Sequence, residues 1–297
     1  MSTSDEVSDD EVSDRDLRGL LFSIAYRMTG RVSIAEDLVQ DTELRLLEVE
    51  QRGVEIRSRR ALATTIVTRL AIDQLRREGH KREVYAGEWL PEPIVTEPDA
   101  DPLEHAGLAD SVSMAVLVVL ERLNPAERAA FLLHDVFGLG YDEIAETLGK
   151  SEANVRQITA RARKAIAAGR RRFSATRERS WEIAGAFLRA SEVGDVDALV
   201  GLLAEDVVVV GDGGGKVATR RQPTVGAGPA SRLVANMFRS FDRFGLAASL
   251  MSVNSQPGVV VTDAAGRAVI VMELEIGDGA VFGIRAVANP DKLTHVQ

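Results

Sequence analysis

The segment from Leu123 to Arg172 most constrains the fold of this chain, because its turn residues divide it into consecutive helices. Asn124-Pro125 marks a helix start, since asparagine caps a helix N-terminus well and proline fits the first helical position. The Gly-Leu-Gly stretch over 138–140 ends that helix. A short helix is expected over 142–148, and a longer one over 151–169. A short helix, a glycine-containing turn and a longer helix together predict a helix-turn-helix.

The longer helix has two different faces. At 100° per residue, Val155, Ile158, Ala162 and Ile166 share one side and are expected to pack on the domain core. Residues 153–172 hold seven Lys/Arg and no Asp/Glu. Arg and Gln near the helix start suit base edges in a major groove, and the later cations suit phosphates. The predicted DNA-binding residues here are Ser151, Ala153, Asn154, Arg156, Gln157, Arg161 and Lys164. The alternative is an ordinary solvated basic face.

The composition fits a multidomain protein of packed cores. At 297 residues and 45% hydrophobic content, two or three domains are expected. The absence of cysteine excludes disulfides and thiolate metal sites, and no metal or cofactor is expected. The longest apolar run, 114–120, is far too short to span a bilayer. The acidic N-terminus lacks the pattern of a signal peptide, so a cytoplasmic protein without a membrane partner is expected.

The net charge of −9 is unevenly distributed. Residues 1–16 hold seven acids and one Arg, and 83–112 hold eight acids and no Lys/Arg. Basic residues concentrate in 57–82 (eight Lys/Arg against two acids) and in 153–172. Two local basic patches in an acidic protein indicate that strong non-specific DNA binding is disfavoured.

Helices are also expected before the linker. Residues 17–30 form one amphipathic helix, Ser33 caps the next, and a long helix runs over about 58–77. Residues 36–55 hold seven acids against two Arg, so this unit is charge-polarised. Residues 85–112 are a linker by composition, with four Pro and no helical period. Within it Trp89 and Leu90 are expected to dock on a domain.

After residue 176 the pattern changes to helices followed by strands. Two helices are expected over 181–204, then a buried strand at 207–210, the Gly-rich loop 212–216 and a helix within 226–244. Strands over 246–254, 258–262, 267–274 and 280–288 are separated by Gly, Asp and Pro turns. The prediction is an α+β domain with a curved antiparallel sheet.

Several motifs in order resemble one protein family. AEDLVQDTELRL (35–46), RALATTIVTRLAIDQLRR (60–77) and the 124–165 segment resemble the extracytoplasmic-function (ECF) sigma factors of bacteria. The C-terminal part resembles a SnoaL-like domain of the NTF2-like fold. WLPEP (89–93), DGGGK (212–216) and NPDKL (289–293) point to the sigma J group. The implied fold class is therefore two all-α sigma domains followed by an α+β SnoaL-like domain.

The resemblance also implies domain boundaries. These are an acidic tail over 1–15, a region 2 domain over 16–84, a linker over 85–112, a region 4 domain over 113–175 and a SnoaL-like regulatory domain over 176–297.

The resemblance implies partners and site residues. The partners are core RNA polymerase and promoter DNA, and the free protein is expected to be monomeric. The 36–47 helix would bind polymerase through Glu36, Asp37, Gln40 and Asp41; the alternative is a solvated face. The 60–77 helix would read the downstream promoter element through Thr65, Arg69, Arg76 and Arg77. Glu43 stands where the family leads us to expect an aromatic residue.

The residues expected to regulate the protein between its domains are Trp89, Leu90, Pro91, Asp212, Lys216, Asn289, Asp291 and Lys292. Lys216 is expected to contact the sigma part or the acidic linker around Glu88 and Glu92.

Other functions are disfavoured by the residues present. No histidine lies between 176 and 290, which argues against a His-based cavity enzyme. Asp197, Asp206, Asp212 and Asp263 show no pairing that suggests catalysis, and DGGGK lacks the full phosphate-loop pattern. The chain is expected not to be an enzyme, although the C-terminal domain leaves room for an unknown small-molecule ligand. The main alternative is a ligand-sensing repressor that binds duplex DNA alone.

Overall fold

The chain folds into two compact units in the computed structural model, which describes residues 14–82, 85, 87–98, 113–169 and 176–296. Among the described residues, 14–79 and 120–167 form a helical unit, and the others form a unit built around a sheet. Most of the expected acidic tail, and the linker from residue 99 to 112, lie outside the described residues. Within the described ranges, every helix is too short or too polar to cross a bilayer.

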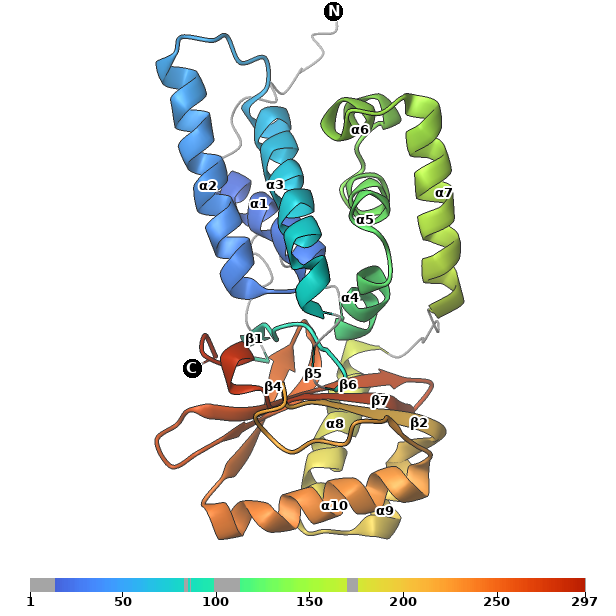
Figure 1. Ribbon diagram of the computed structural model, residues 1–297. Helices are drawn as coiled ribbons and strands as arrows, with labels where there is room; N and C mark the ends of the chain where they lie inside the picture. Colours follow the sequence, from blue (N-terminus) through green and yellow to red (C-terminus); the bar gives the residue numbers. More distant parts are fainter. Residues whose placement is uncertain (1–13, 83–84, 86, 99–112, 170–175, 297) are drawn as a thin grey trace, which may run out of the picture. The chain divides into compact units, whose positions relative to one another are not determined.

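The helical unit begins with α1 (Asp14–Thr29), α2 (Val32–Gln51) and α3 (Arg59–Arg82), as Figure 1 shows. Gly30 adopts a φ of 68°, a backbone conformation that only glycine enters readily, and this ends α1. The core between the helices includes Leu21, Ile24, Met28 and Leu46, each at most 1% exposed. The prediction of three helices is confirmed, but Arg31 rather than Ser33 precedes α2 as its cap residue.

The helix-turn-helix follows α4 (Met114–Glu121) and α5 (Pro125–Phe131). The helix that was expected to continue toward Gly138 widens at η1 (Leu132–Val136) into a π-helical turn. The two later helices of the motif are α6 (Tyr141–Leu148) and α7 (Glu152–Gly169), both close to their predicted ranges. The turn residues of this segment did not predict the π turn.

The second unit is an α+β domain with one sheet. Its helices are α8 (Arg177–Glu192), α9 (Val196–Leu202) and α10 (Ala227–Phe244), and η2 (Pro290–Lys292) is a 3₁₀ turn. The sheet order is β1-β4-β5-β6-β7-β2-β3, antiparallel except where β2 and β7 pair in parallel. The strands are β1 (Val95–Thr96), β2 (Leu203–Asp212), β3 (Thr224–Val225), β4 (Ala247–Val253), β5 (Gln256–Thr262), β6 (Ala268–Gly277) and β7 (Ala280–Val287).

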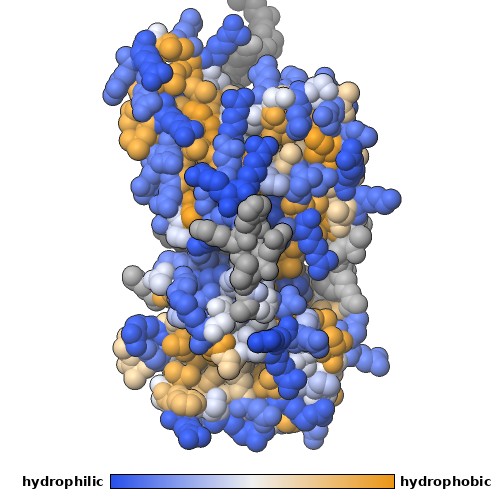
Figure 2. All heavy atoms as spheres, in the orientation of Figure 1, coloured by the Kyte–Doolittle hydropathy of each residue, from blue (hydrophilic) through white to orange (hydrophobic). Residues whose placement is uncertain are grey.

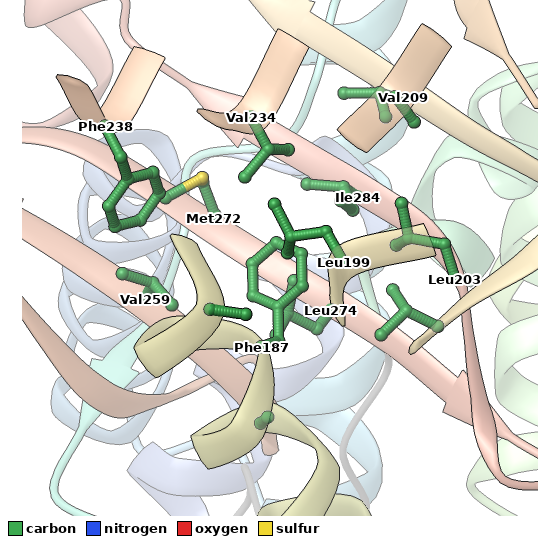
Figure 3. Close-up of a cluster of buried hydrophobic side chains, with 14 of the residues drawn as sticks. Phe187, Leu199, Leu203, Val209, Val234, Phe238, Val259, Met272, Leu274 and Ile284 are labelled. Atoms are coloured by element: carbon green, nitrogen blue, oxygen red, sulfur yellow. The ribbon is translucent and has the colours of Figure 1, made fainter. Parts of the chain in front are cut away.

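Both faces of this sheet are covered by apolar side chains. The helices α8, α9 and α10 cover one face, where Phe187, Phe238 and Met272 lie in one buried cluster, seen in Figure 3. On the other face a second cluster joins sheet residues to Leu90 of the linker and Met114 of α4. Alternation along β5 explains how one sheet serves two cores, because successive side chains point to opposite faces.

Two predictions for this unit need correction. The segment 207–210 is not a wholly buried strand: Val207 and Val209 are buried, whereas Val208 is 36% exposed. The cause is that β2 is flanked on one side only by the two-residue strand β3, so that its outer surface stays in contact with solvent. The linker was expected to lack regular structure, yet Val95 and Thr96 form β1 and pair with β4.

Candidate nucleic-acid interface and linker site

The turn between α6 and α7 is fixed by backbone geometry. Gly149 has a φ of 61°, the left-handed conformation that ends a helix, and the N–H of Lys150 donates to the carbonyl of Ala145 at 3.0 Å. Ser151 then caps α7, because its hydroxyl accepts from the N–H of Asn154 at 3.3 Å. The angle between the two helices is therefore set by residues that the sequence alone identified.

The two faces of α7 are divided as expected. Val155 and Ala162 are fully buried, and Ile158 and Ile166 are at most 8% exposed. The residues predicted to contact DNA are all exposed: Ser151, Ala153, Asn154, Arg156, Gln157, Arg161 and Lys164. This surface has the shape and charge that major-groove recognition requires.

The residues predicted to read the downstream element are divided by the structure. Thr65 is half-buried, and its hydroxyl lies 3.1 Å from that of Thr147 in α6. Arg69 donates from Nε to the carbonyl of Thr147 and from Nη2 to that of Glu146, both at 2.9 Å. Both residues thus contact the helix-turn-helix within the helical unit, a contact that the sequence did not predict.

Arg76 and Arg77 are exposed near the C-terminal end of α3. Arg76 lies 3.4 Å from Asp73, and Arg77 donates to the carbonyl of Asp73 at 3.3 Å. These are weak, local interactions on an open surface, so both guanidinium groups can reach a phosphate backbone.

A second arginine, Arg128, also connects the helices before the linker with those after it in the helical unit. Arg128 of α5 is 3% exposed and donates from Nη1 to the carbonyl of Met28 near the end of α1. Burial lowers the pKa of Arg128 to about 10. Arg69 of α3 therefore binds carbonyls in the last turn of α6, and Arg128 of α5 binds a carbonyl in the last turn of α1, so each arginine caps a helix in the other half of the unit.

The face of α2 predicted to bind polymerase is exposed and mixed in character. Its polar members Glu36, Asp37, Gln40 and Asp41 all lie at the surface. Two apolar residues of the same helix, Leu44 and Leu47, are 60% and 47% exposed. Figure 2 shows hydrophobic surface over the C-terminal part of α2. Acidic and apolar groups on one helix face are typical of a protein-binding surface. Glu43 of the same helix forms an ion pair with Arg18 of α1 at 2.7 Å.

The linker binds the sheet unit through one buried carboxylate. Asp212 is fully buried, and its Oδ2 accepts from the Leu90 N–H at 2.8 Å and from Lys292 Nζ at 2.6 Å. Its Oδ1 accepts from the Tyr85 hydroxyl at 2.6 Å and from the Gly214 N–H at 3.0 Å. Burial, followed by the hydrogen bond to Asp212, raises the pKa of Tyr85 above its usual range.

Lys292 completes this site from the other end of the chain. Its ammonium is buried, donates to the Leu90 carbonyl, and lies 4.3 Å from the centroid of the Trp89 ring. Asn289 donates to the Tyr85 hydroxyl at 3.0 Å. The WLPEP, DGGGK and NPDKL motifs thus meet at one ion pair, with Pro91 buried beside it.

The expected role of Lys216 is wrong. Lys216 pairs with Asp291 at 2.6 Å in an exposed position, and the lysine that reaches the linker backbone is Lys292. The sequence indicated Lys216 because it stands next to the Gly-rich loop. The short 3₁₀ turn η2, which Asn289 caps, instead brings Lys292 to the linker; the Asn289-Pro290 pair signals a turn but does not show that this turn carries the lysine to the linker.

Further contacts extend the linker site along the sheet edge. The Ile94 N–H donates to Asn254 Oδ1 at 3.1 Å, and the Asn254 N–H donates to the Ile94 carbonyl at 2.8 Å. His295 contacts the carbonyl of Pro93 at 2.8 Å. Arg177 donates to the carbonyl of Pro98 at 2.7 Å. The described part of the linker is therefore bound at intervals from Tyr85 to Pro98.

A buried glutamate holds the start of α4. Glu273 of β6 is fully buried, and its Oε2 accepts from the Met114 N–H at 2.7 Å. Its Oε1 is buried without a hydrogen-bond partner among the described residues. Burial, opposed by the nearby Arg285, raises the pKa of Glu273 to about 8.

Apolar side chains line the layer between the sheet and its helices. They include Phe187, Leu199 and Phe238 (Figure 3). The aspartates considered for catalysis lie elsewhere: Asp197 and Asp206 are exposed, Asp263 pairs with Arg267 and Asp212 belongs to the linker site. The described residues contain no group of three or more His, Asp or Glu positioned to hold a metal ion.

A helix-turn-helix with a basic recognition helix, joined to a second helical region with an acidic and apolar face, defines a promoter-recognition subunit. Family models agree: residues 15–81 match sigma-70 region 2, and residues 113–166 match sigma-70 region 4.

Relatives match nearly the whole chain. It is 40% identical over 288 residues to the ECF RNA polymerase sigma factor SigJ of Mycobacterium tuberculosis, covering 94% of this chain and 91% of that protein. It is 30% identical to the probable ECF sigma factor SigI of the same species, covering 93% and 92% of the two chains. The crystal structure of M. tuberculosis SigJ superposes with a TM-score of 0.76 at 38% identity, covering 94% of this chain and 96% of that one.

The chain therefore belongs to the ECF RNA polymerase sigma factors, and its fold class is that of helical sigma regions followed by an α+β domain. Its role is promoter recognition for core RNA polymerase. Family membership replaces the alternative of a repressor that acts on duplex DNA alone.

Proposed function

We propose that the C-terminal domain regulates this sigma factor by binding its linker. The observation that carries the proposal is the buried Asp212–Lys292 pair, which holds Leu90 through both its N–H and its carbonyl. Breaking a buried ion pair by removing one partner is strongly destabilising, of order 3–5 kcal/mol. The pair thus fixes the two groups that bind the Leu90 backbone, and docking of the linker on them can bias the equilibrium between its bound and released states.

Linker docking limits how far the two DNA-binding regions can separate. Residues 85–113 comprise 29 residues, and the contacts at 85–98 hold the first 14 of them, which leaves 15 residues of chain between Pro98 and Met114. Fully extended, a stretch of 29 residues spans about 100 Å and a stretch of 15 residues spans about 50 Å. A sigma factor must place two regions on two promoter elements, so docking favours a resting state and release favours promoter binding.

Particular residues are proposed for each partner. Exposed residues of α7 would read the upstream element, and Arg69, Arg76 and Arg77 of α3, with Thr65, would serve the downstream one. The acidic and apolar face of α2, from Glu36 to Leu47, would bind core RNA polymerase. Support comes from exposure and charge, and Arg69 would leave its carbonyl partners on α6 when DNA binds.

The C-terminal domain is proposed to act without catalysis. The apolar lining of the layer between sheet and helices supports this, and so does the position of Asp212 in the linker site. The same packing gives no support to a small-molecule ligand in that layer. Coverage of the outer sheet face by Leu90 and Met114 supports a monomer when the protein is free.

The test is run-off transcription with core RNA polymerase and the full chain. Asp212→Ala and the double change Trp89→Ala with Leu90→Ser remove the contact from opposite sides. Each is expected to raise the transcript yield at limiting sigma factor by roughly threefold or more, since the resting state loses its main restraint. Lys216→Met, which breaks the exposed pair with Asp291, is the matched control and should leave the yield nearly unchanged.

Limited proteolysis within 85–98 reports whether the linker has been released. Faster cleavage in both linker variants, combined with an unchanged or lower transcript yield, would overturn the regulatory proposal.

A further inference from the structure

Tyr141, the first residue of α6, lies at the centre of a cluster that includes two arginines of the recognition helix. The guanidinium carbon of Arg156 is 4.3 Å from the centroid of the Tyr141 ring. The hydroxyl of Tyr141 is a hydrogen-bonding neighbour of Arg163, which lies about two turns after Arg156 in α7. The ring is half-buried, whereas both arginines are exposed.

Two residues of the π turn η1 contact this cluster. The ring of His134 stacks on that of Tyr141 with centroids 4.1 Å apart and 29° between the planes. His134 is itself held by a 2.9 Å contact from Nδ1 to the Leu139 carbonyl. The next residue of the turn, Asp135, binds Arg163 Nε with both carboxylate oxygens, at 2.8 and 3.0 Å. Single π turns often occur at functional sites, and this one supplies two adjacent supporting groups.

We propose that Tyr141 is a positioning residue for promoter recognition, with its ring fixing Arg156 for base reading and its hydroxyl fixing Arg163 for phosphate binding. This inference rests on the proposed role of α7 as reader of the upstream element.

The physical reason lies in the freedom of the arginine side chain. An unrestrained arginine loses several rotamers on binding, and an aromatic ring beneath a planar guanidinium reduces that loss before DNA arrives. Arg156 also pairs with Glu152, one turn earlier in α7. That pair is exposed on both sides, so base acceptors can replace it while the ring contact remains.

The test uses the full-length holoenzyme on a promoter whose upstream element is varied one base pair at a time. Arg156→Ala first identifies the base pair at which discrimination is lost. Tyr141→Leu, which removes the ring, is expected to reduce discrimination at that same base pair by about three- to tenfold. Tyr141→Phe keeps the ring, so base preference should stay near that of the wild type, while binding weakens evenly across sequences. Phe244→Leu is the matched control, because Phe244 is an exposed aromatic with Arg243 at 5.9 Å in the C-terminal unit.

The double variant Tyr141→Leu with Arg156→Ala separates positioning from a structural role. If Tyr141 acts through Arg156, it should lose no more discrimination than Arg156→Ala alone. A loss from Tyr141→Leu that is equal at all base pairs, or that persists in the Arg156→Ala background, would overturn the positioning role. If Arg156→Ala itself changes no base preference, the proposed reading role of Arg156 fails instead.

Discussion

Arg69 of α3 caps the end of α6 by donating from Nε to the carbonyl oxygen of Thr147 at 2.9 Å. The same guanidinium is proposed to bind the downstream promoter element. One side chain therefore serves two mutually exclusive partners, and the helix end competes with DNA for it. In the structure the guanidinium is bound by the helix end, where the last turn of α6 presents the carbonyls of Glu146 and Thr147 to a side-chain donor.

Arg69→Met should therefore have two effects. The free energy of unfolding is expected to fall by about 1 kcal/mol, since two hydrogen bonds to helix-end carbonyls are lost. Promoter-dependent transcription should fall as well. Urea unfolding and run-off transcription measure the two effects. Arg76→Met is the control: its partner Asp73 is three residues away on an exposed surface, so stability should stay within about 0.5 kcal/mol. Equal stability losses in the two variants would contradict the cap.

Glu273 is expected to make stability fall as pH rises. Its pKa is raised to about 8 in the folded state from an ordinary 4.5, with Arg285, Glu275 and the Met114 N–H as its neighbours. Between these values the folded state holds a proton that the unfolded state has released. The unfolding free energy should then decrease with pH, by up to about 1.4 kcal/mol per unit.

The pH dependence is measured by urea unfolding at pH 5.5, 7 and 8.5. Glu273→Gln keeps the shape and an acceptor for Met114 but does not titrate, so its stability should vary less with pH between 5.5 and 8.5. The exposed Glu192→Gln serves as control and should retain the wild-type slope. A slope in Glu273→Gln as steep as in the wild type would show that another group is responsible.

Gly214→Ala should disrupt the linker site specifically. Gly214 has a φ of 58°, and a Cβ there would lie 2.2 Å from the Asn289 side chain, which donates to Tyr85. Gly266→Ala is a close match, with a φ of 78° and open space around its Cβ. Both variants carry the backbone cost of about 1 kcal/mol, but only Gly214→Ala should also speed proteolysis between residues 85 and 98. Similar cleavage rates in the two variants would argue against a built contact.

Leu44→Ser on α2 should weaken binding to core RNA polymerase without unfolding the protein. Leu44 is 60% exposed, so the substitution is expected to change the free energy of unfolding by no more than about 0.5 kcal/mol. Binding to immobilised core enzyme measures the first effect. Val54→Ser, at 57% exposure in the loop after α2, is the control. Comparable binding by both variants would remove Leu44 from the polymerase surface.

The sequence predicted well what depends on local pattern. The Asn124 cap, the end of α6 at Gly149 and the apolar side of α7 all follow from short-range rules, and the structure contains each of them. The docking of Leu90 was also foreseeable, because an apolar residue in a flexible linker would otherwise stay exposed.

Long-range pairing was harder to foresee. Lys216 and Lys292 are both lysines near acidic groups, and only the three-dimensional path of η2 selects Lys292 for the buried site. The contacts of Arg69 and Arg128 with helix ends need a packing arrangement that no periodicity encodes. The apolar pattern of α2 also does not show that Leu44 and Leu47 are exposed while Leu46 between them is buried.

The linker strand β1 has a consequence for how the molecule folds. β1 completes one edge of the sheet by pairing with β4, although more than 150 residues separate Val95 from Val253. Region 4 is thus inserted, in sequence, into a domain whose two parts lie on either side of it. During synthesis the linker emerges well before the strands that receive it, so the resting state can form only after the DNA-binding regions have been made. A fragment starting at residue 176 would expose a bare sheet edge and an apolar face, and we expect such a fragment to self-associate.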